Sequence, residues 1–185
     1  MTTIALDQRN YRIGADNNAD PDLCTWSASD NTPGSYPIGT KAMIRIQVAE
    51  DVGNSTANTY WSLYYNTVDN PDTATQVTSI TNPKISDGTP TDGTATDTRI
   101  CAEQAETWKN GLYSESDTTG KFALTGNYYT EFQFCIEFTS GATGTYYFYL
   151  FYNAAKLNGT YDNVVQITVA TTETKEFTAD AILAA

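Results

Sequence analysis

The residues best suited to binding chemistry are acidic and amide side chains gathered in two loops. The stretch Asp16–Asp22, with sequence DNNADPD, places an acid or amide at every second position, which is how a calcium loop begins. Such a loop also needs a glycine at its sixth position and a glutamate at its twelfth, where this chain has Pro21 and Ser27. A second oxygen-rich stretch, Asp87–Asp97, contains two glycines. We interpret both as solvated turns, with calcium binding as the alternative.

Glu131 and Glu137 are the best candidates for a pair of catalytic carboxylates. Glycoside hydrolysis needs two acids about 5 to 10 Å apart. These two lie on one face of a predicted strand, about 20 Å apart by strand rise. The intervening Gln133 and the phenylalanines on the opposite face indicate an ordinary outer surface. The chain has no histidine, which excludes Ser-His-Asp and Cys-His mechanisms. We predict a protein that is not an enzyme and uses no cofactor.

The three cysteines, Cys24, Cys101 and Cys135, are an odd number and cannot all pair within one chain. We predict buried or half-buried free thiols, with a Cys101–Cys135 disulfide as the alternative. Neither a CxxC motif nor a histidine accompanies them, so a metal site is disfavoured.

Aromatic side chains offer a different kind of binding chemistry. Trp26, Trp61, Trp108 and the 13 tyrosines could form a platform on which sugar rings stack, as in carbohydrate-binding modules. Tyrosine and tryptophan are also favoured in protein cores and interfaces. We favour core and interface positions over a sugar platform.

The charge of the chain limits its partners. It has 22 acidic and 10 basic residues in 185, a net charge of −12. A surface this negative repels nucleic acid and acidic lipid, so we predict neither as a partner. The opening MTTIALDQRN lacks the basic start and apolar core of a signal peptide, and no apolar run reaches membrane-spanning length. We expect synthesis in a host cytoplasm without a signal peptide.

These candidates must be positioned by strands. Phe132, Phe134, Ile136 and Phe138 alternate with polar residues, which predicts a strand with one buried face. After the turn at 139–144, Thr145–Tyr152 is aromatic or aliphatic at seven of eight positions, so both faces of the next strand are apolar. We predict that the two strands form a central β-hairpin.

Further strands are predicted on both sides of this centre. Lys41–Ala49 alternates Ala42, Ile44, Ile46 and Val48 on a core face with Met43, Arg45 and Gln47 on a wet face, and we pair it with Tyr60–Asn66 as a second hairpin. Shorter strands are predicted at Cys24–Trp26, Gln76–Ile80, Lys84–Ile85 and Val164–Val169, and one helical turn within Thr98–Trp108. This pattern predicts an all-β antiparallel sandwich, immunoglobulin-like or jelly-roll-like, with an N-terminal arm at 1–12, a sandwich domain at 13–170 and a C-terminal tail at 171–185.

Several segments of the sandwich are similar to a module of uncharacterised phage and environmental surface proteins. The module opens with an aromatic-Arg-hydrophobic triplet, an Asp/Asn loop and a Thr-x-Trp strand, followed by a Gly-x-x-hydrophobic-Arg strand, a turn and a Tyr-rich strand. Its second half has a glutamate-led strand before a final hairpin. The matching segments here are Tyr11-Arg12-Ile13, Asp16–Asp22, Thr25-Trp26, Gly39–Val48, Asp51–Asn54, Tyr60–Asn66 and TTGKFALTGNYYTEFQFCIEF.

The segment Thr174–Leu183, TKEFTADAIL, resembles one copy of a T-K-x-F-T-A-D-A-hydrophobic-Leu repeat found beside surface and phage structural domains. The two resemblances imply a virion structural protein on the particle surface. We predict a capsid decoration protein with the major capsid protein as its partner. The alternatives are a tail or fibre subunit, or a cell-surface carbohydrate-binding or adhesive module. A single repeat copy argues against a long stalk.

The second apolar face of Thr145–Tyr152 leads to a prediction about assembly. A sandwich core covers one face of a strand, and soluble monomers rarely expose a large apolar patch. The pattern of the resembled module suggests that Tyr147, Tyr149 and Phe151 point inward. We therefore predict a homo-oligomer or particle contact, with cover by the 67–97 loop or the C-terminal tail as the alternative. The predicted interface residues are Tyr146, Phe148, Leu150, Tyr152, Phe177, Ile182 and Leu183.

Overall fold

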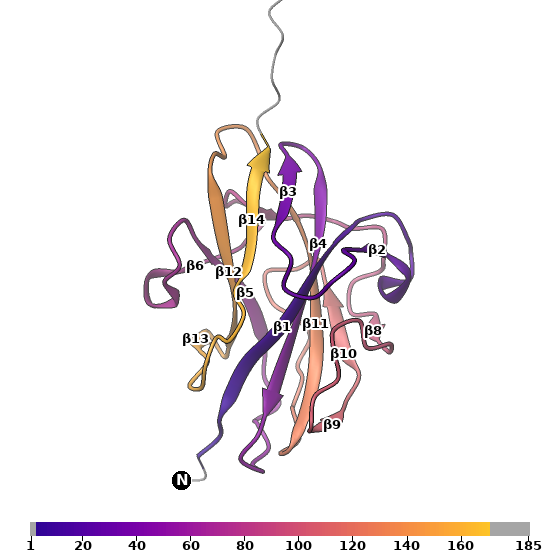
Figure 1. Cartoon of the computed structure of the whole chain (residues 1–185), viewed down its shortest axis with the longest axis vertical. Helices are drawn as coiled ribbons and strands as arrows, with labels where there is room; N and C mark the ends of the chain where they lie inside the picture. The colour runs from indigo at the N-terminus through magenta and orange to yellow at the C-terminus, as the bar shows by residue number, and fades with distance from the viewer. Residues whose placement is uncertain (1–2, 171–185) are drawn as a thin grey trace, which may run out of the picture.

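The computed structural model describes residues 3–170, which form two β-sheets packed face to face (Figure 1). The strands run along the long axis, with the N-terminal end at the bottom of the view and the end of β14 at the top. Helical structure in the described residues is limited to two three-residue turns, η1 (Pro21–Leu23) and η2 (Pro71–Thr73). No helix within 3–170 is long and apolar enough to cross a membrane. The predicted all-β sandwich is confirmed.

The first sheet is built around two ten-residue strands that pair antiparallel along their whole length, β4 and β11. Its order is β2 (Thr25–Trp26), β1 (Leu6–Ala15), β4 (Lys41–Glu50), β11 (Tyr128–Glu137), β10 (Gly111–Ser114) and β8 (Ala95–Thr96), with β7 (Lys84–Ile85) and β9 (Thr107–Trp108) also paired to β11.

The second sheet is built around the aromatic strand β12. Its order is β3 (Gly34–Pro37), β14 (Val165–Ala170), β12 (Thr145–Tyr152), β5 (Trp61–Asn66) and β6 (Thr75–Gln76), with β13 (Ala155–Lys156) also paired to β12. The edge strand β3 runs parallel to β14, while β14, β12 and β5 are antiparallel neighbours.

The strand order can be compared with that of immunoglobulin domains, one of the two predicted types of sandwich. Immunoglobulin domains have strands A, B, E and D in one sheet and C, F and G in the other. Here β1, β4, β11 and β10 follow the first order, and β5, β12 and β14 follow the second. A buried tryptophan, Trp61, opens β5, the counterpart of strand C, where immunoglobulin domains also bury a tryptophan. One departure is that β10 pairs parallel to β11.

The core between the sheets follows the predicted alternation. The inner faces of β4 and β11 supply Ala42, Ile44, Ile46, Val48, Phe132, Phe134 and Ile136, all within the main core cluster. Trp61 packs on Phe132 with ring centroids 4.9 Å apart, and its Nε1 donates to the Phe122 carbonyl over 3.2 Å. The buried amide of Gln8 joins the sheets, because its Oε1 accepts a hydrogen bond of 2.8 Å from the Leu150 N–H on β12. The predicted inner faces of β4 and β11 are confirmed.

Both predicted hairpins are wrong. β11 lies in the first sheet and β12 in the second, so the turn at 138–144 crosses between sheets. The same holds for β4 and β5, whose connection also crosses the sandwich. The β4 strand instead pairs with β1 and β11, and β5 pairs with β12 and β6. Turn residues show where the chain reverses, but a reversal within a sheet and a crossing between sheets use the same residue types.

Two local expectations also need correction, and one strand was not predicted. The predicted N-terminal arm at 1–12 is wrong beyond residue 5, because β1 begins at Leu6 and pairs with β4. The edge strand β3 was not predicted from the sequence. The predicted helical turn within Thr98–Trp108 is not helical and ends instead in the short strand β9. Residues 171–185 lie outside the described residues.

Candidate functional sites

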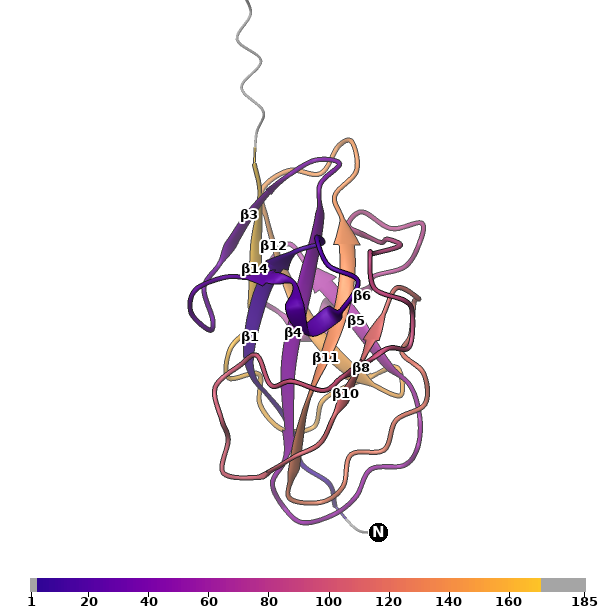
Figure 2. The ribbon, with the colours of Figure 1, turned by 90° about the vertical axis from the view of Figure 1, so that its right-hand side faces the viewer.

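The outward face of the first sheet is buried, contrary to the prediction of a wet outer surface. Arg45, Gln47, Glu131 and Gln133 are all 0 % exposed. Two long loops cover them, one between β1 and β3 and one between β7 and β11. Figure 2 shows the first loop, with η1 lying in front of β4, and the second loop crossing below it. Polar residues do alternate with apolar ones along β4 and β11, as predicted. Their polar face, however, contacts the two loops and not water.

A network of ion pairs lies at the centre of this buried layer. The Arg45 guanidinium contacts the Asp22 carboxylate through Nη2, and its Nε lies 3.6 Å from Glu131 Oε2. The guanidinium carbon also lies 5.4 Å from the ring centroid of Trp26, a cation–π contact. At the margin, Arg12 Nε donates to Asp30 Oδ1 over 2.6 Å. Buried charges of this kind are tolerated only when paired.

The three carboxylates of this layer bind the backbone of residues 97–102. Asp22 Oδ2 accepts from the N–H groups of residues 97 and 98 at 2.8 and 2.7 Å. Glu131 accepts from residues 100 and 101 at 3.0 and 2.9 Å, and Asp30 accepts from residue 102 at 2.6 Å. These amides donate to carboxylates from distant strands and loops and not to carbonyl groups four residues earlier in the chain, and the predicted helical turn does not form.

Burial sets the electrostatics of this layer. Burial raises the pKa of the Glu131 carboxyl above its usual value of 4.5, while Arg45 and the two amides oppose that rise. Two buried nitrogens of Arg45 and the Oε1 atom of Gln133 have no hydrogen-bond partner among the described residues. The carboxylates of the layer bind the loop backbone and hold the loops on the sheet. The charged groups of the layer face one another and do not line an open cavity.

The cysteines belong to the same covered face. Cys24 and Cys135 pack with Met43 and Tyr113, and Cys101 lies beside Glu131, to which its N–H is bonded. All three are free and buried, as predicted, and the alternative Cys101–Cys135 disulfide is not formed. Burial raises the pKa of each thiol, that of Cys135 to about 12. These thiols are therefore protonated and unreactive at neutral pH.

The predicted interface face of β12 is wrong. Phe148 and Leu150 are 0 % exposed and belong to the main core, together with Tyr146, while Tyr152 packs against it. The ring of Tyr146 lies 5.0 Å from that of Phe138, which closes the core at the 138–144 crossing. Because β12 belongs to the second sheet, its even-numbered side chains point inward, the reverse of the prediction. The other predicted interface residues, Phe177, Ile182 and Leu183, lie outside the described residues.

The opposite face of β12 is covered by the chain itself. Tyr149 is 0 % exposed, and its hydroxyl donates to Asp69 Oδ1 over 2.8 Å, within the loop that precedes η2. Its ring meets Tyr161 edge to face at 5.4 Å. Phe151 stacks on Tyr64 with centroids 3.8 Å apart and an interplanar angle of 9°. The 67–97 loop, which the alternative prediction gave as the cover, therefore contacts this face through Asp69, and Tyr64 and Tyr161 cover further parts of it.

The acidic loops have structural roles. Asp20 caps η1 by accepting from the Asp22 N–H over 2.9 Å, and Asp22 belongs to the buried layer. In the second loop, Asp92 Oδ1 accepts from the Glu115 N–H over 3.0 Å. Within residues 3–170, no group of three or more cysteine and acidic side chains has the arrangement of a metal site. Sequence spacing alone did not reveal these backbone contacts.

The tryptophans do not form an open platform. Trp61 is 0 % exposed, and Trp26 and Trp108 are half-buried, against Arg45 and Tyr129 respectively. Their positions agree with the preference for core and packing roles over a platform for sugar rings.

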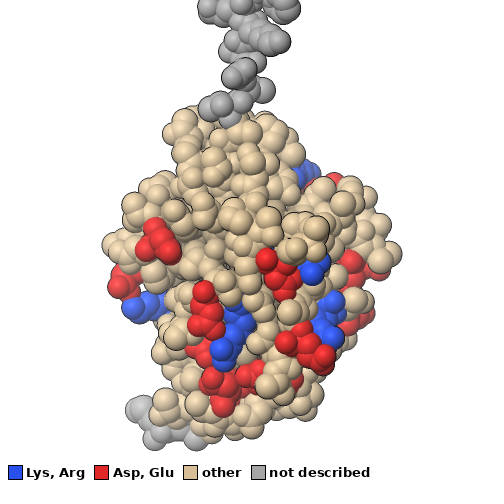
Figure 3. Space-filling model, in the orientation of Figure 1, with Lys and Arg blue, Asp and Glu red and all other residues tan. Residues whose placement is uncertain are grey.

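At one end of the sandwich, three neighbouring loops contain no charged residue of their own, and we call them the uncharged end. The loops 37–40 and 138–144 lie at the end where β14 finishes, and the loop 78–83 lies beside them; none contains Asp, Glu, Lys or Arg. Asn82 joins two of the loops, since its side chain bonds both the N–H and the carbonyl of Thr139. In Figure 3 the topmost surface is tan, and charged side chains gather lower on the visible face. These three loops are therefore uncharged segments of a chain whose net charge is −12.

This uncharged end displays isoleucines. Ile38 is 44 % exposed and Ile80 is 93 % exposed. The turn that holds Ile80 is braced: the Thr78 N–H donates to Thr81 Oγ1 over 2.8 Å, and the Ser79 N–H donates to a carboxylate oxygen of Asp117 over 3.0 Å. An isoleucine held outward there contributes nothing to the core. The sequence predicted a short strand at Gln76–Ile80, but β6 ends at Gln76 and residues 78–81 form a turn, so the exposure of Ile80 was not predicted.

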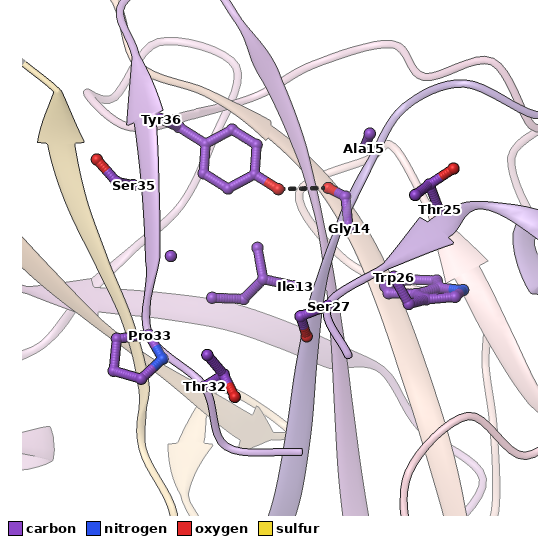
Figure 4. A pocket seen from close by; sticks show the side chains of 11 residues that line it. Ile13, Gly14, Ala15, Thr25, Trp26, Ser27, Thr32, Pro33, Ser35 and Tyr36 are labelled. Atoms are coloured by element: carbon purple, nitrogen blue, oxygen red, sulfur yellow. Dashed lines mark hydrogen bonds between the residues drawn. The ribbon is translucent and has the colours of Figure 1, made fainter. Parts of the chain in front are cut away.

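A pocket of about 350 Å³ lies beside the edge strand β3 (Figure 4). The phenol of Tyr36 extends across it, and its hydroxyl donates to the Gly14 carbonyl over 2.9 Å. Ile13 and Pro33 form apolar walls. All the lining residues are uncharged: Ile13, Gly14, Ala15, Thr25, Trp26, Ser27, Thr32, Pro33, Gly34, Ser35 and Tyr36.

Comparison with known proteins found no matching family model, no matching curated protein and no matching solved structure.

Proposed function

We propose that this protein is a structural component of a virus or phage particle, a decoration protein on the capsid surface, attached through its uncharged end. The observation that carries the proposal is the exposure of Ile80 and Ile38 on two loops of an acidic sandwich that contain no charged residue of their own. Self-repulsion between acidic copies is smallest there. The major capsid protein is the proposed partner.

The rest of the architecture suits a passive role on a particle. The chain covers the outward face of the first sheet with an ionic layer, and it covers part of the outward face of the second sheet with aromatic rings. Loops held by buried carboxylates cost little further ordering when a partner binds, which favours affinity. The resemblance to phage and environmental surface modules points the same way.

The first test is mass spectrometry of purified particles from the source of this sequence. The proposal expects the chain among the particle proteins, and a protein absent from particles overturns it. Localisation by cryo-electron microscopy then assigns it to capsid, tail or fibre. Glycan-array binding by the isolated protein, lost on substitution of an aromatic residue, would instead support an adhesive module.

The second test addresses the attachment surface. Ile80→Asp should lower rebinding to particles stripped of the protein by about tenfold or more, the effect of losing an interface hot spot, with unfolding unchanged. The matched control is Val52→Asp, because Val52 is 52 % exposed and follows the opposite end of β4. Equal loss in both variants, or in neither, would contradict attachment through the uncharged end.

A further inference from the structure

Three polar atoms in the buried layer over the first sheet have no hydrogen-bond partner among residues 3–170. They are Arg45 Nη1, Gln133 Oε1 and Trp26 Nε1, and all three are shielded from solvent. Figure 4 shows the Trp26 nitrogen at the end of the ring that points away from Tyr36 and the pocket. Folded proteins leave few buried polar groups without a partner, and an ordered water commonly supplies one. These atoms therefore indicate a binding site inside the layer.

The residues that carry the three atoms are neighbours in space. Arg45 on β4 and Gln133 on β11 are directly opposite in the strand register. Residues paired in this way have Cβ atoms about 5 Å apart and side chains on the same face. The guanidinium carbon of Arg45 lies 5.4 Å from the ring centroid of Trp26 on β2. Gln133 Nε2 lies 4.0 Å from the sulfur of Cys24, two residues before Trp26. The three side chains thus meet where β2, β4 and β11 share one covered face.

The other polar atoms of Arg45 and Gln133 already have contacts. Arg45 Nη2 contacts Asp22, and Arg45 Nε lies 3.6 Å from Glu131 Oε2. A guanidinium holds its donors in a rigid planar fork, so Nη1 cannot turn toward the carboxylates that Nε and Nη2 face. The amide nitrogen of Gln133 faces Cys24, which leaves the amide oxygen as the free atom.

The chemical types of the free atoms identify the ligand. The two nitrogens are donors, whereas the amide oxygen is an acceptor. An anion could not bond the amide oxygen, and the Asp22 and Glu131 carboxylates already outnumber the charge of Arg45. A cation would be repelled by Arg45 and could not bond either nitrogen. A water molecule can accept from both nitrogens and donate to the oxygen, and about three hydrogen bonds is usual for buried water.

We propose that one buried water molecule accepts hydrogen bonds from Arg45 Nη1 and Trp26 Nε1 and donates one to Gln133 Oε1. The water connects the two central strands of the first sheet to β2, which follows η1 in the loop that covers this face. It completes the hydrogen bonding of the ionic layer. This inference does not depend on the particle role proposed above.

The first test uses the wild-type chain and its indole groups as internal controls. Transfer of magnetisation from water to the indole N–H groups is measured in nitrogen-15-resolved NOE and ROE spectra. The Trp26 N–H should show a signal with water that has opposite signs in the two spectra, which distinguishes a bound water from proton exchange. The Trp61 N–H donates to the Phe122 carbonyl and should show no such signal.

The second test removes the acceptor. Gln133→Met keeps a side chain of similar length but has no amide oxygen, so we expect loss of the water signal at the Trp26 N–H. The matched control is Gln76→Met on β6 in the second sheet, which should leave that signal unchanged. Equal loss in both variants, or loss in neither, would contradict the proposal.

A crystal structure of the wild type identifies the ligand even if Gln133→Met does not fold. The proposal expects one density peak within about 3.2 Å of all three atoms, with no anomalous signal there in crystals grown with bromide. A bromide peak would overturn the proposal in favour of an anion. Absence of a peak, or a direct hydrogen bond from Arg45 Nη1 to Gln133 Oε1, would also overturn it.

Discussion

The two sheets differ in what covers their outward faces. On the first sheet, buried carboxylates pair with arginines and accept hydrogen bonds from the backbone of residues 97–102. On the second sheet, aromatic rings cover part of β12. Both faces are closed by the chain, but with different energetics. A buried ion pair contributes little net stability yet is costly to break, while ring packing contributes in proportion to the area buried. The loops over the first sheet therefore stay in place because moving them would leave buried charges unpaired. The loops over the second sheet stay in place because their contacts bury apolar surface.

The largest effect should come from the inner face of β12. Phe148→Asp should prevent folding, because it places an unpaired charge where the side chain is 0 % exposed. Circular dichroism and gel filtration would detect the loss of the sandwich. Phe151→Asp, on the outward face beside Tyr64, should be tolerated better. A folded Phe148→Asp protein would show that this face is not core and would restore it as a possible interface.

The next effect should come from the ionic layer. Arg45→Ala leaves the Asp22 and Glu131 carboxylates buried without their cation, so we expect a loss of about 3 to 5 kcal/mol of unfolding free energy in urea titrations. The control is Arg99→Ala, since the Arg99–Glu103 pair is exposed and should change stability little. A loss equal to that of Arg99→Ala would mean that the layer does not hold the loops.

The reactivity of the cysteine thiols gives a second measure of whether the loops over the first sheet have loosened. In the wild type, the three buried thiols should not react with a thiol reagent at neutral pH until the protein unfolds. In Arg45→Ala, loosening of the loops should make Cys101 react first, because its backbone is held by Glu131. Fast reaction of the native wild type would contradict a closed layer.

A smaller effect is expected on the aromatic side. Tyr149→Phe removes the hydroxyl bonded to Asp69 but keeps the ring, so we expect a loss of about 1 kcal/mol. Tyr147→Phe, on the same face, is the matched control, because the Tyr147 hydroxyl has no hydrogen bond within the described residues. Thermal unfolding of both variants would show whether the polar contact contributes beyond ring packing.

The smallest expected effect is a pH dependence from Glu131. Its pKa is raised in the folded state, so the folded protein binds the proton more tightly than the unfolded chain. The stability that Glu131 contributes should therefore be complete below pH 4.5 and decline as the pH rises through the raised value. The stability advantage of the wild type over Glu131→Gln should narrow over that range. A widening difference would mean that Arg45 and the amides outweigh burial.

Much of the framework could be predicted from local pattern. The alternation of Ile44 and Ile46 with Arg45 and Gln47 gave the correct inner face of β4, and the odd cysteine count indicated free thiols. The uncharged end was also present in the sequence, although Ile80 was not recognised, because exposure depends on which neighbours reach a turn. The ionic layer was missed, since Asp22 meets Arg45 only through tertiary folding.

The sequence by itself determined that the protein is all-β, where its long strands lie, and which residues alternate along them. These properties follow from steric and hydrophobic periodicity between residues close in the chain. Tertiary structure decided which sheet each strand joins, which face of β12 points inward, and that loops cover Arg45 and Glu131. The physical reason is that partners such as Glu131 and the Cys101 N–H are separated by 30 residues, so their contact depends on how the strands between them are arranged in space.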